Sequence, residues 1–488
     1  MSQAPGSTSE TLSTPSLAAR LGPRVDALDL LRGLAILGIF VMNTWTMSMP
    51  QEAYTNPATY SPDWILGQGF PDVGYALKPL TGVNYWTYFW VHMLADMKFI
   101  TMFSIMFGAG IVLQSERARV KGKNPWTIHY LRMAVLLCFG LVHSFAFWYG
   151  DILTDYAICG LILGPLRLLP SAVLALAAIL MISGVSGIDY VRTHQSDNVV
   201  MVKSRDAVNQ IDQLQNKIRD GWDAKMLARG EDFMVNQYYN ANDYELDIYQ
   251  GTPDRNPLQN WWREVLGHRG KTSVVDHTTG FLDWVFPRCG GCILLGMALQ
   301  KRRFFHGRWG AAAYALMAAV ALPIGWTIVA KGIWYNDANR WNEDSLWHNG
   351  VEFNYWGSLF CTFGYMCVGV LFAMAAASRR WLNLALMPLR SVGRMALSNY
   401  LTQSVVGTTL FYGHGLGLFG KVSRFGLLPI VFAMWFAQLV ASTIWLRYFR
   451  QGPLEWLWHS IVYWKWKSPL LPVELRRRAL TSEEPAQA

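Results

Sequence analysis

Charged residues are scarce in this chain of 488 residues. Asp, Glu, Lys and Arg together make up 15% of it, whereas soluble domains carry about 25%. Hydrophobic residues supply 52% of the chain, and aromatic residues supply 14%. This balance argues against a soluble globular protein. It is typical of a polytopic membrane protein whose aromatic side chains gather at the two membrane interfaces.

Cysteine is also rare, with six residues, of which Cys289 and Cys292 form one CxxC pair. A zinc site needs further ligands at characteristic spacing, and no second pair or suitably spaced histidine accompanies this one. We therefore predict no metal site and no bound cofactor, and we expect the CGGC segment to serve close helix packing. The first apolar run lacks a clear cleavage site for secretion, so we expect it to be retained as a membrane span.

Acidic residues are fewer than basic ones, which leaves a net charge of +9. Most Lys and Arg residues flank apolar runs, a pattern that indicates anchoring of membrane helices rather than nucleic-acid binding. The predicted partners are therefore the lipid bilayer and a small-molecule substrate, with no nucleic acid. The sequence does not indicate an oligomeric state.

Long apolar runs predict an all-α, polytopic integral membrane protein with about ten transmembrane helices. The expected spans are 27–48, 91–114, 129–149, 152–168, 171–190, 281–300, 310–330, 353–377, 395–413 and 426–446. The organisation that follows is a disordered cytoplasmic tail (1–23), helices 1–5 (24–191), a polar extracytoplasmic insert (192–280), helices 6–10 (281–447) and a basic cytoplasmic tail (448–488). This arrangement places the short basic segments on one side, so both termini are predicted to be cytoplasmic.

Polar side chains inside membrane spans are costly and often functional. In the first span, Asp29 and Arg32 lie three residues apart and can form an ion pair. Asn43 returns to the same helix face roughly 16 Å further along. The predicted topology gathers a polar group at the cytoplasmic side: Asp29, Arg32, Arg394, Asn399 and Gln403. The pair of Asp29 and Arg32 can equally be structural, because an ion pair at a helix end needs no ligand.

His143 and Asp151 are the predicted general base and its supporting acid on the opposite side. A neutral imidazole takes a proton from a hydroxyl near neutral pH, and a carboxylate fixes its tautomer. Both residues also have structural interpretations: the histidine can bridge two helices, and the aspartate can cap the helix after the Gly150 turn. His92, Asp96, Lys98 and Asp155 are expected on the same side. For six histidines the sequence predicts no partner: His92, His129, His306, His348, His414 and His459.

Several blocks of the chain resemble the YeiB-like family of bacterial multi-pass inner-membrane proteins, a domain of unknown function. They are LDLLRGLAILGIFVMN (28–43), KFITMFSIMFGAGIVLQ (98–114), GLVHSFAFWYGDILTDYAICGLIL (140–163), GRMALSNYLTQS (393–404), FYGHGLGLFG (411–420) and GPLEWLWHSIVY (452–463). Ser398 stands where the family more often has Thr, and His459 where it more often has Arg. The resemblance implies a location in the bacterial plasma (inner) membrane.

The opening block is also similar to that of the superfamily of membrane acyltransferases, which implies transfer of an acyl group, often acetyl from coenzyme A. On this hypothesis, acyl-CoA is a co-substrate whose phosphates meet Arg32 and Arg394 at the cytoplasmic side. His143 deprotonates the acceptor hydroxyl or amine, and Asn43 steadies the oxyanion. His143 is chosen on physical grounds, because the superfamily's histidine does not map onto this sequence by motif.

Two other functions compete with acyl transfer. A transporter or exporter of a small polar or amphipathic molecule would use the same buried charges as a substrate or proton path. A non-catalytic membrane component would use the insert as a docking surface.

Overall fold

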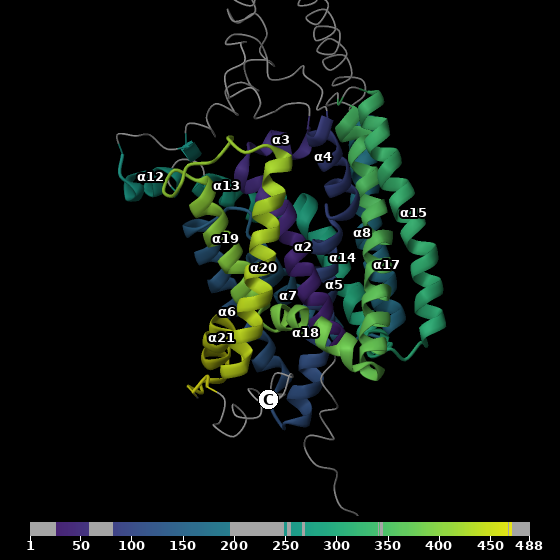
Figure 1. Ribbon diagram of the computed structural model, residues 1–488. Coiled ribbons are helices and arrows are strands. Elements are labelled where there is room, and N and C mark those ends of the chain that lie inside the picture. The colour runs from purple at the N-terminus through teal and green to yellow at the C-terminus, as the bar shows by residue number, and fades with distance from the viewer. Residues whose placement is uncertain are drawn as a thin grey trace, which may run out of the picture.

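The computed structural model describes residues 26–57, 82–195, 248–250, 255–265, 269–339, 341, 345–466 and 468–470 (Figure 1). This part of the chain is helical, and its only β-type pairing is an isolated bridge between Phe449 and Leu470. The all-α prediction is therefore confirmed for the described residues. The predicted 1–23 tail, most of the 192–280 insert and the end of the 448–488 tail lie outside them.

Most of the helices in the described ranges are apolar. In chain order the helices are α2 (Asp26–Ser48), α3 (Gln51–Thr55), α4 (Gly82–Leu94), α5 (Lys98–Val120), α6 (Pro125–Ala146), α7 (Leu153–Leu163), η2 (Gly164–Leu168), α8 (Ser171–Gln195), α12 (Pro257–Glu264), α13 (Gly270–Val275), η5 (Asp276–Val285), α14 (Phe286–Lys301), η6 (Phe304–His306), α15 (Ala311–Ala338), η7 (Leu346–Gly350), α17 (Val351–Ser378), α18 (Arg380–Arg394), α19 (Ala396–Phe411), α20 (Arg424–Tyr448) and α21 (Pro453–Tyr463).

Six helical segments in the described ranges are long and apolar enough to cross a membrane: α2, the α4–α5 pair, α6, α15, α17 and α20. A seventh arises if Gly270–Leu282 and Phe286–Lys301, which meet at 64°, form one bent span. The chain is therefore a multi-pass membrane protein. Helices α7 and α19 coincide with predicted spans, but their 11 and 16 residues are shorter than the roughly 20 that a bilayer requires. The count of about ten spans stays a prediction.

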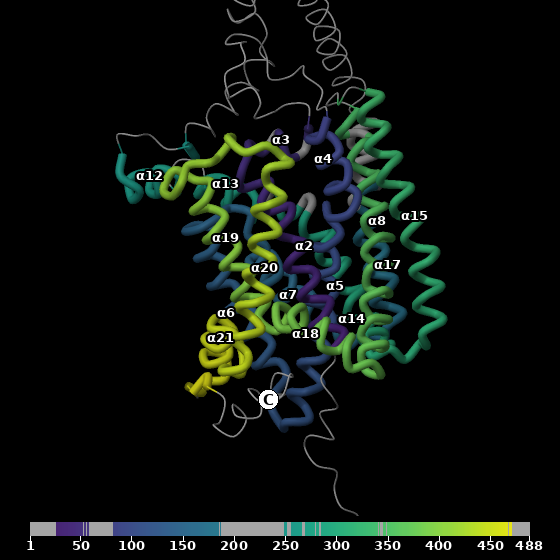
Figure 2. The backbone as a smooth tube through the Cα atoms, in the orientation of Figure 1, coloured from purple at the N-terminus to yellow at the C-terminus, as the bar shows by residue number. Residues whose placement is uncertain are grey.

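Most helices run along one common direction, and α18 crosses the lower end of the bundle at the foot of α2 (Figures 1 and 2). Glycines allow this crossing, because a Cβ on Gly33 would lie 2.0 Å from the carbonyl oxygen of Leu389. A Cβ on Gly393 would likewise lie 1.9 Å from that of Asp29. The backbones of α2 and α18 therefore touch directly, which small residues make possible in membrane proteins.

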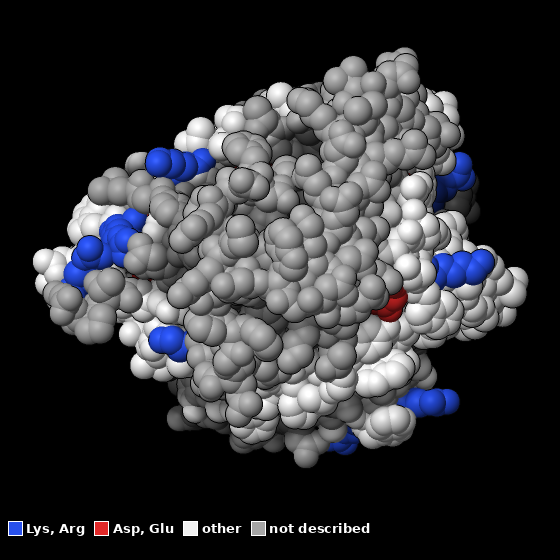
Figure 3. All heavy atoms as spheres, turned by 90° about the horizontal axis from the view of Figure 1, so that it is seen from above, with Lys and Arg blue, Asp and Glu red and all other residues white. Residues whose placement is uncertain are grey.

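Basic side chains gather at the α18–α21 end of the bundle. The guanidinium of Arg167 donates to Ser115 and stacks over the Trp126 ring. The ammonium of Lys301 donates to the carbonyl of Leu169. At the opposite end, seen in Figure 3, the Lys and Arg side chains of the described surface lie apart at its margin.

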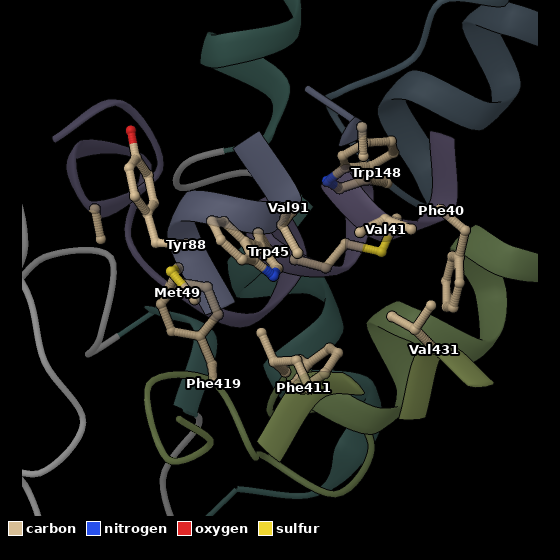
Figure 4. Packing of buried hydrophobic residues seen from close by; sticks show 14 of the residues in the cluster. Phe40, Val41, Trp45, Met49, Tyr88, Val91, Trp148, Phe411, Phe419 and Val431 are labelled. Carbon is tan, nitrogen blue, oxygen red and sulfur yellow. The ribbon is translucent and has the colours of Figure 1, made fainter. Parts of the chain in front are cut away.

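The other end of the bundle encloses an aromatic core. Trp45 of α2 lies between Tyr88 of α4 and the loop that carries Phe419, and its ring stacks on Tyr88 with centroids 6.0 Å apart (Figure 4). Trp148, from the turn between α6 and α7, packs beside Val41 in the same cluster. This core fixes the α6–α7 turn against the upper half of α2.

Helices α12 and α13 are anchored on the last turn of α6. Trp261 Nε1 and Arg269 Nη1 both donate to the carbonyl oxygen of Ala146, at 3.0 and 2.6 Å. That carbonyl has no partner inside its own helix, and a cation at a helix C-terminus is favoured by the helix dipole. Arg269 is fully buried and also pairs with Glu264 at 2.6 Å. The described part of the predicted insert is therefore packed onto the bundle.

We predict that Gly108→Ala destabilises the protein. A Cβ at Gly108 would lie 1.9 Å from the carbonyl oxygen of Ile293, so α5 and α14 would have to separate. Overpacking of this kind costs about 1–3 kcal/mol, which thermal unfolding in detergent would detect as a lower midpoint. Gly184→Ala is the matched control, because a Cβ there meets nothing within 4 Å. Equal midpoints for the two variants would contradict the prediction.

Candidate functional site

The predicted base and acid meet at the upper end of α6. His143 lies in the last turn of this helix, and Asp151 follows the turn that leads into α7. His143 Nδ1 lies 2.7 Å from Asp151 Oδ1, and the two side chains are 1% and 0% exposed. The eight intervening residues form a tight connection, so the pair depends on α6 and α7 lying side by side.

The second nitrogen of the His143 ring has no partner. A carboxylate only accepts hydrogen bonds, so Nδ1 must carry the proton that Asp151 receives. In the neutral ring, Nε2 then presents a lone pair, and this buried atom has no hydrogen-bond partner among the described residues. Phe147, Trp148 and Tyr400 surround the ring, with centroids 5.3–6.4 Å away. The site therefore holds an oriented proton acceptor in an aromatic enclosure.

Asp151 also holds the start of α7. Its Oδ2 accepts a hydrogen bond from the backbone N–H of Thr154 at 2.7 Å, which satisfies one of the free donors of the helix N-terminus. Gly140 lets the two helices approach, because a Cβ there would lie 2.4 Å from Thr154 N. The capping role that the sequence suggested is confirmed, and it coexists with the contact to His143.

A second imidazole–carboxylate pair lies beside the first, and the sequence did not reveal it. His277 of η5 places Nδ1 2.9 Å from Asp155 Oδ1, and its Nε2 lies 2.9 Å from Ser144 Oγ. Asp151 lies just before α7 and Asp155 lies in its first turn, so the two carboxylates follow one another at the start of this helix. The missed residue is His277, which falls in the predicted insert, 122 positions from its partner. In the sequence, only the spacing of Asp151 and Asp155 indicated that two carboxylates would lie close together.

The predicted cytoplasmic group is only partly brought together. Arg32 Nη1 lies 3.5 Å from Asp29 Oδ1, with the side chains 31% and 7% exposed. Arg394 lies at the junction of α18 and α19, where its Nη2 donates to the carbonyl of Arg450 at 3.2 Å. The ion pair that the spacing of Asp29 and Arg32 predicted is therefore present.

Asn399 and Gln403 lie inside the bundle, where they join helices. Asn399 Nδ2 donates to the hydroxyl of Ser442 on α20 at 3.0 Å. Gln403 Nε2 donates to Gln438 Oε1 at 2.8 Å and to the carbonyl of Ile36 on α2 at 3.2 Å. These amides therefore connect α19, α20 and α2, and such interhelical hydrogen bonds are common in membrane proteins.

Asn43 is not brought to His143. It is half-buried on α2, where its backbone carbonyl accepts a hydrogen bond from Thr46 Oγ1 at 3.0 Å. Within the described ranges its side chain makes no hydrogen bond to His143 or Asp151. A groove of about 640 Å³ runs between α2, α18 and α20, and it does not link the two predicted half-sites. It is lined by apolar residues that include Leu34, Leu37, Leu389, Trp435 and Leu439.

A third polar cluster lies where α4 gives way to α5. Met97 adopts φ 60° there, and the fully buried Lys98 begins α5. Lys98 Nζ donates to the carbonyl of His92 at 2.7 Å and to Asn354 Oδ1 at 2.8 Å. Asn354 Nδ2 in turn donates to Asp96 Oδ2 at 2.7 Å. One asparagine of α17 thus bridges a buried cation and a buried anion.

Three of the histidines for which the sequence predicted no partner do have one in the structure. His92 Nδ1 lies 3.0 Å from Asp96 Oδ2, one helical turn away, and His129 Nε2 lies 2.9 Å from the carbonyl oxygen of Gly160. His414 Nδ1 lies 2.7 Å from Glu264 Oε2. The interpretation of these three as unpartnered interface residues was wrong. Within the described ranges, no three His, Cys, Asp or Glu side chains are placed to hold a metal ion.

Glu455 of α21 holds the start of α19. Its carboxylate accepts hydrogen bonds from the backbone N–H groups of Leu397 and Ser398, at 2.7 and 3.1 Å, and from the Ser398 hydroxyl. Burial raises the pKa of Glu455, and the hydrogen bonds from Ser398 oppose that rise. The carboxylate replaces the missing helix partners of α19 and neutralises the positive end of its dipole.

With this geometry established, the chain can be compared with known proteins. It is 28% identical to the uncharacterized protein YeiB of Escherichia coli over 451 residues, which cover 89% of this chain and 95% of the relative. It is 30% identical to the uncharacterized protein YxaH of Bacillus subtilis over 452 residues, 91% of this chain and 95% of that protein. The chain belongs to the YeiB-like family. An uncharacterized 39.9 kDa protein from the amylase 3' region of Bacillus acidopullulyticus is 24% identical over 92% of this chain and 97% of its own length.

A family model described as a protein of unknown function, DUF418, matches residues 299–465. That region runs from the end of α14 to α21 and includes Asn399, Gln403 and Glu455. His143 and Asp151 precede it, inside the larger region shared with the YeiB-like relatives. No solved structure matches this chain.

Replacing Glu455 with alanine is expected to destabilise the protein by about 2 kcal/mol, because two backbone donors at the start of α19 lose their acceptor. Thermal unfolding of the detergent-solubilised protein measures the change. Glu116→Ala is the control, since that glutamate is exposed on α5. A Glu455→Ala protein whose unfolding midpoint equals that of the wild-type protein would refute the proposed cap.

Proposed function

We propose that this YeiB-like protein transfers a short acyl group from acyl-CoA to an acceptor hydroxyl or amine. The observation that carries the proposal is the buried His143, which Asp151 holds at 2.7 Å through Nδ1 and whose Nε2 has no partner among the described residues. This is the arrangement of a general base that waits for a substrate proton.

The proposed reaction is a nucleophilic substitution at the thioester carbonyl. The acceptor gives its proton to His143 Nε2 as its oxygen or nitrogen attacks the carbonyl carbon. The carbon–sulfur bond then breaks, and the coenzyme A thiolate leaves with the proton from the imidazolium. Asp151 stabilises the imidazolium between these two steps, as a buried carboxylate does in other acyl-transfer enzymes. Asn43 remains the proposed oxyanion partner, which would require a rearrangement around the upper part of α2.

We further propose that the α18–α21 end faces the bacterial cytoplasm, with both termini on that side of the inner membrane. The gathering of Arg167, Lys301 and Arg394 at this end supports it, because basic segments favour the cytoplasmic side. The partly exposed Arg32 is a suitable anchor for the phosphates of acyl-CoA. In this orientation, a total of ten spans requires that α7 and α19 each cross the membrane together with the turns that flank them.

We expect His143→Gln to lose about a hundredfold or more of the transfer rate, because glutamine cannot accept and release the proton. The assay is transfer or hydrolysis of labelled acetyl-CoA by purified protein in nanodiscs. His129→Gln serves as the control, because a glutamine there can still donate to the carbonyl of Gly160. Full activity in His143→Gln would exclude His143 as the base.

Transport of a small polar molecule is the second candidate, and the break between α4 and α5 favours it. Transporters place substrate and ion sites at interrupted helices, and here Asp96, Lys98 and Asn354 occupy the interruption. On this alternative, Lys98→Met stops gradient-driven uptake into membrane vesicles, whereas His143→Gln does not. Uptake that is equal with and without a proton gradient, and unaffected by Lys98→Met, would refute it.

A further inference from the structure

Three side chains from three separate elements form a chain of hydrogen-bonded groups beside His143. Ser144 Oγ of α6 lies 2.9 Å from His277 Nε2 of η5, and His277 Nδ1 lies 2.9 Å from Asp155 Oδ1 of α7. The order is hydroxyl, imidazole and carboxylate, which is the order of a nucleophile, its base and the acid that orients the base. We propose that Ser144 is an acyl-accepting nucleophile, activated by His277 and Asp155.

The protonation of this triad follows from its donors and acceptors. A carboxylate accepts only, so His277 Nδ1 must donate to Asp155, and in the neutral ring Nε2 then presents a lone pair. Ser144 has one hydroxyl proton, which it donates to Ser273 Oγ at 2.9 Å, and His277 Nε2 lies at the same distance from Ser144 Oγ. The proposed activation turns this proton from Ser273 to Nε2. All three groups are shielded from water: Ser144 is 0% exposed, and the side chains of His277 and Asp155 are 9% and 6% exposed. The imidazole is therefore oriented and within hydrogen-bond distance of the Ser144 hydroxyl.

The backbone around the triad is shaped to hold His277 in place. η5 is a π-helical segment, an uncommon and costly conformation that occurs often at functional sites. Ser273 on α13, just before η5, lies 2.9 Å from Ser144 Oγ, and its hydroxyl also contacts the carbonyl oxygen of Ser144 at 3.3 Å. A bridge between helices needs one hydrogen bond, whereas this region fixes the direction of both imidazole nitrogens.

The two imidazoles suit two successive half-reactions. This step rests on the proposed function, which supplies the acyl-CoA thioester, and it replaces the direct attack of the acceptor on the thioester by two successive attacks. Ser144 gives its proton to His277 and attacks the thioester carbonyl, the carbon–sulfur bond breaks, and the thiolate takes the proton from His277. His143, the residue next to Ser144, then accepts the proton of the acceptor hydroxyl, which attacks the serine ester and releases Ser144 as the alcohol. The full burial of Ser144 favours a short acyl chain.

The test uses a small fluorophosphonate, which reacts with activated serines and needs no knowledge of the natural substrate. Full-length protein in nanodiscs is incubated with the probe, and the modified residue is located by peptide mass spectrometry. We expect modification at Ser144, its loss in Ser144→Ala, and a rate about a hundredfold lower in His277→Gln. Ser404→Ala is the control, because Ser404 is equally buried but bonds only to the carbonyl of Tyr400.

The outcomes separate this inference from the proposed function. Absence of modification at Ser144 in folded wild-type protein, or an unchanged rate in His277→Gln, overturns the triad even if acetyl transfer is observed. Modification at Ser144 that depends on His277 supports the nucleophile even if acetyl-CoA proves not to be the donor. Because wild-type mapping needs no substitution, a variant that fails to fold does not remove the test.

Discussion

Every polar side chain at membrane depth must find its partner inside the protein, because lipid tails offer none. This constraint organises the whole bundle. The aspartates at the start of α7 receive His143 and His277, Asn354 joins Lys98 to Asp96, and Gln403 joins α19 to α20 and α2. Each polar group ties together helices that are distant in the sequence, so the polar clusters fix how the apolar rods are arranged.

Close backbone contact makes these short polar bonds reachable. Gly140 allows α6 to approach the start of α7, and that approach is what brings His143 to within 2.7 Å of Asp151. Gly108 plays the equivalent part where α5 meets α14, near the buried Arg288, which donates to Thr101 on α5. Helix packing and the polar contacts therefore depend on each other. A bulkier residue at Gly140 or Gly108 would create a clash and would also lengthen the nearby hydrogen bond.

The sequence predicted those features that are encoded locally. Apolar length located α2, α17 and α20 within about two residues, although it missed most of α4 and the last turns of α15. The spacing of Asp29 and Arg32 predicted their ion pair. His143 and Asp151 were also within reach of sequence reasoning, because a tight turn separates them. The partners of Asp155, Asp96 and Leu397 were not, since His277, Asn354 and Glu455 lie 122, 258 and 58 positions away. Hydropathy shows which groups need a partner, but only the three-dimensional arrangement shows which partner they have.

The two histidines of the candidate site differ from each other in what their second nitrogen does. Leaving a buried acceptor without a partner costs about 1–3 kcal/mol, and native proteins rarely retain such atoms. His143 Nε2 retains this cost among the described residues, and the carboxylate of Asp151 prevents the ring from turning to relieve it. His277 Nε2 instead contacts the Ser144 hydroxyl, a group that is itself reactive once its proton is accepted. Packing alone would favour apolar residues of similar size at both positions. The carboxylates of Asp151, just before α7, and Asp155, on α7, set the direction of the two imidazoles.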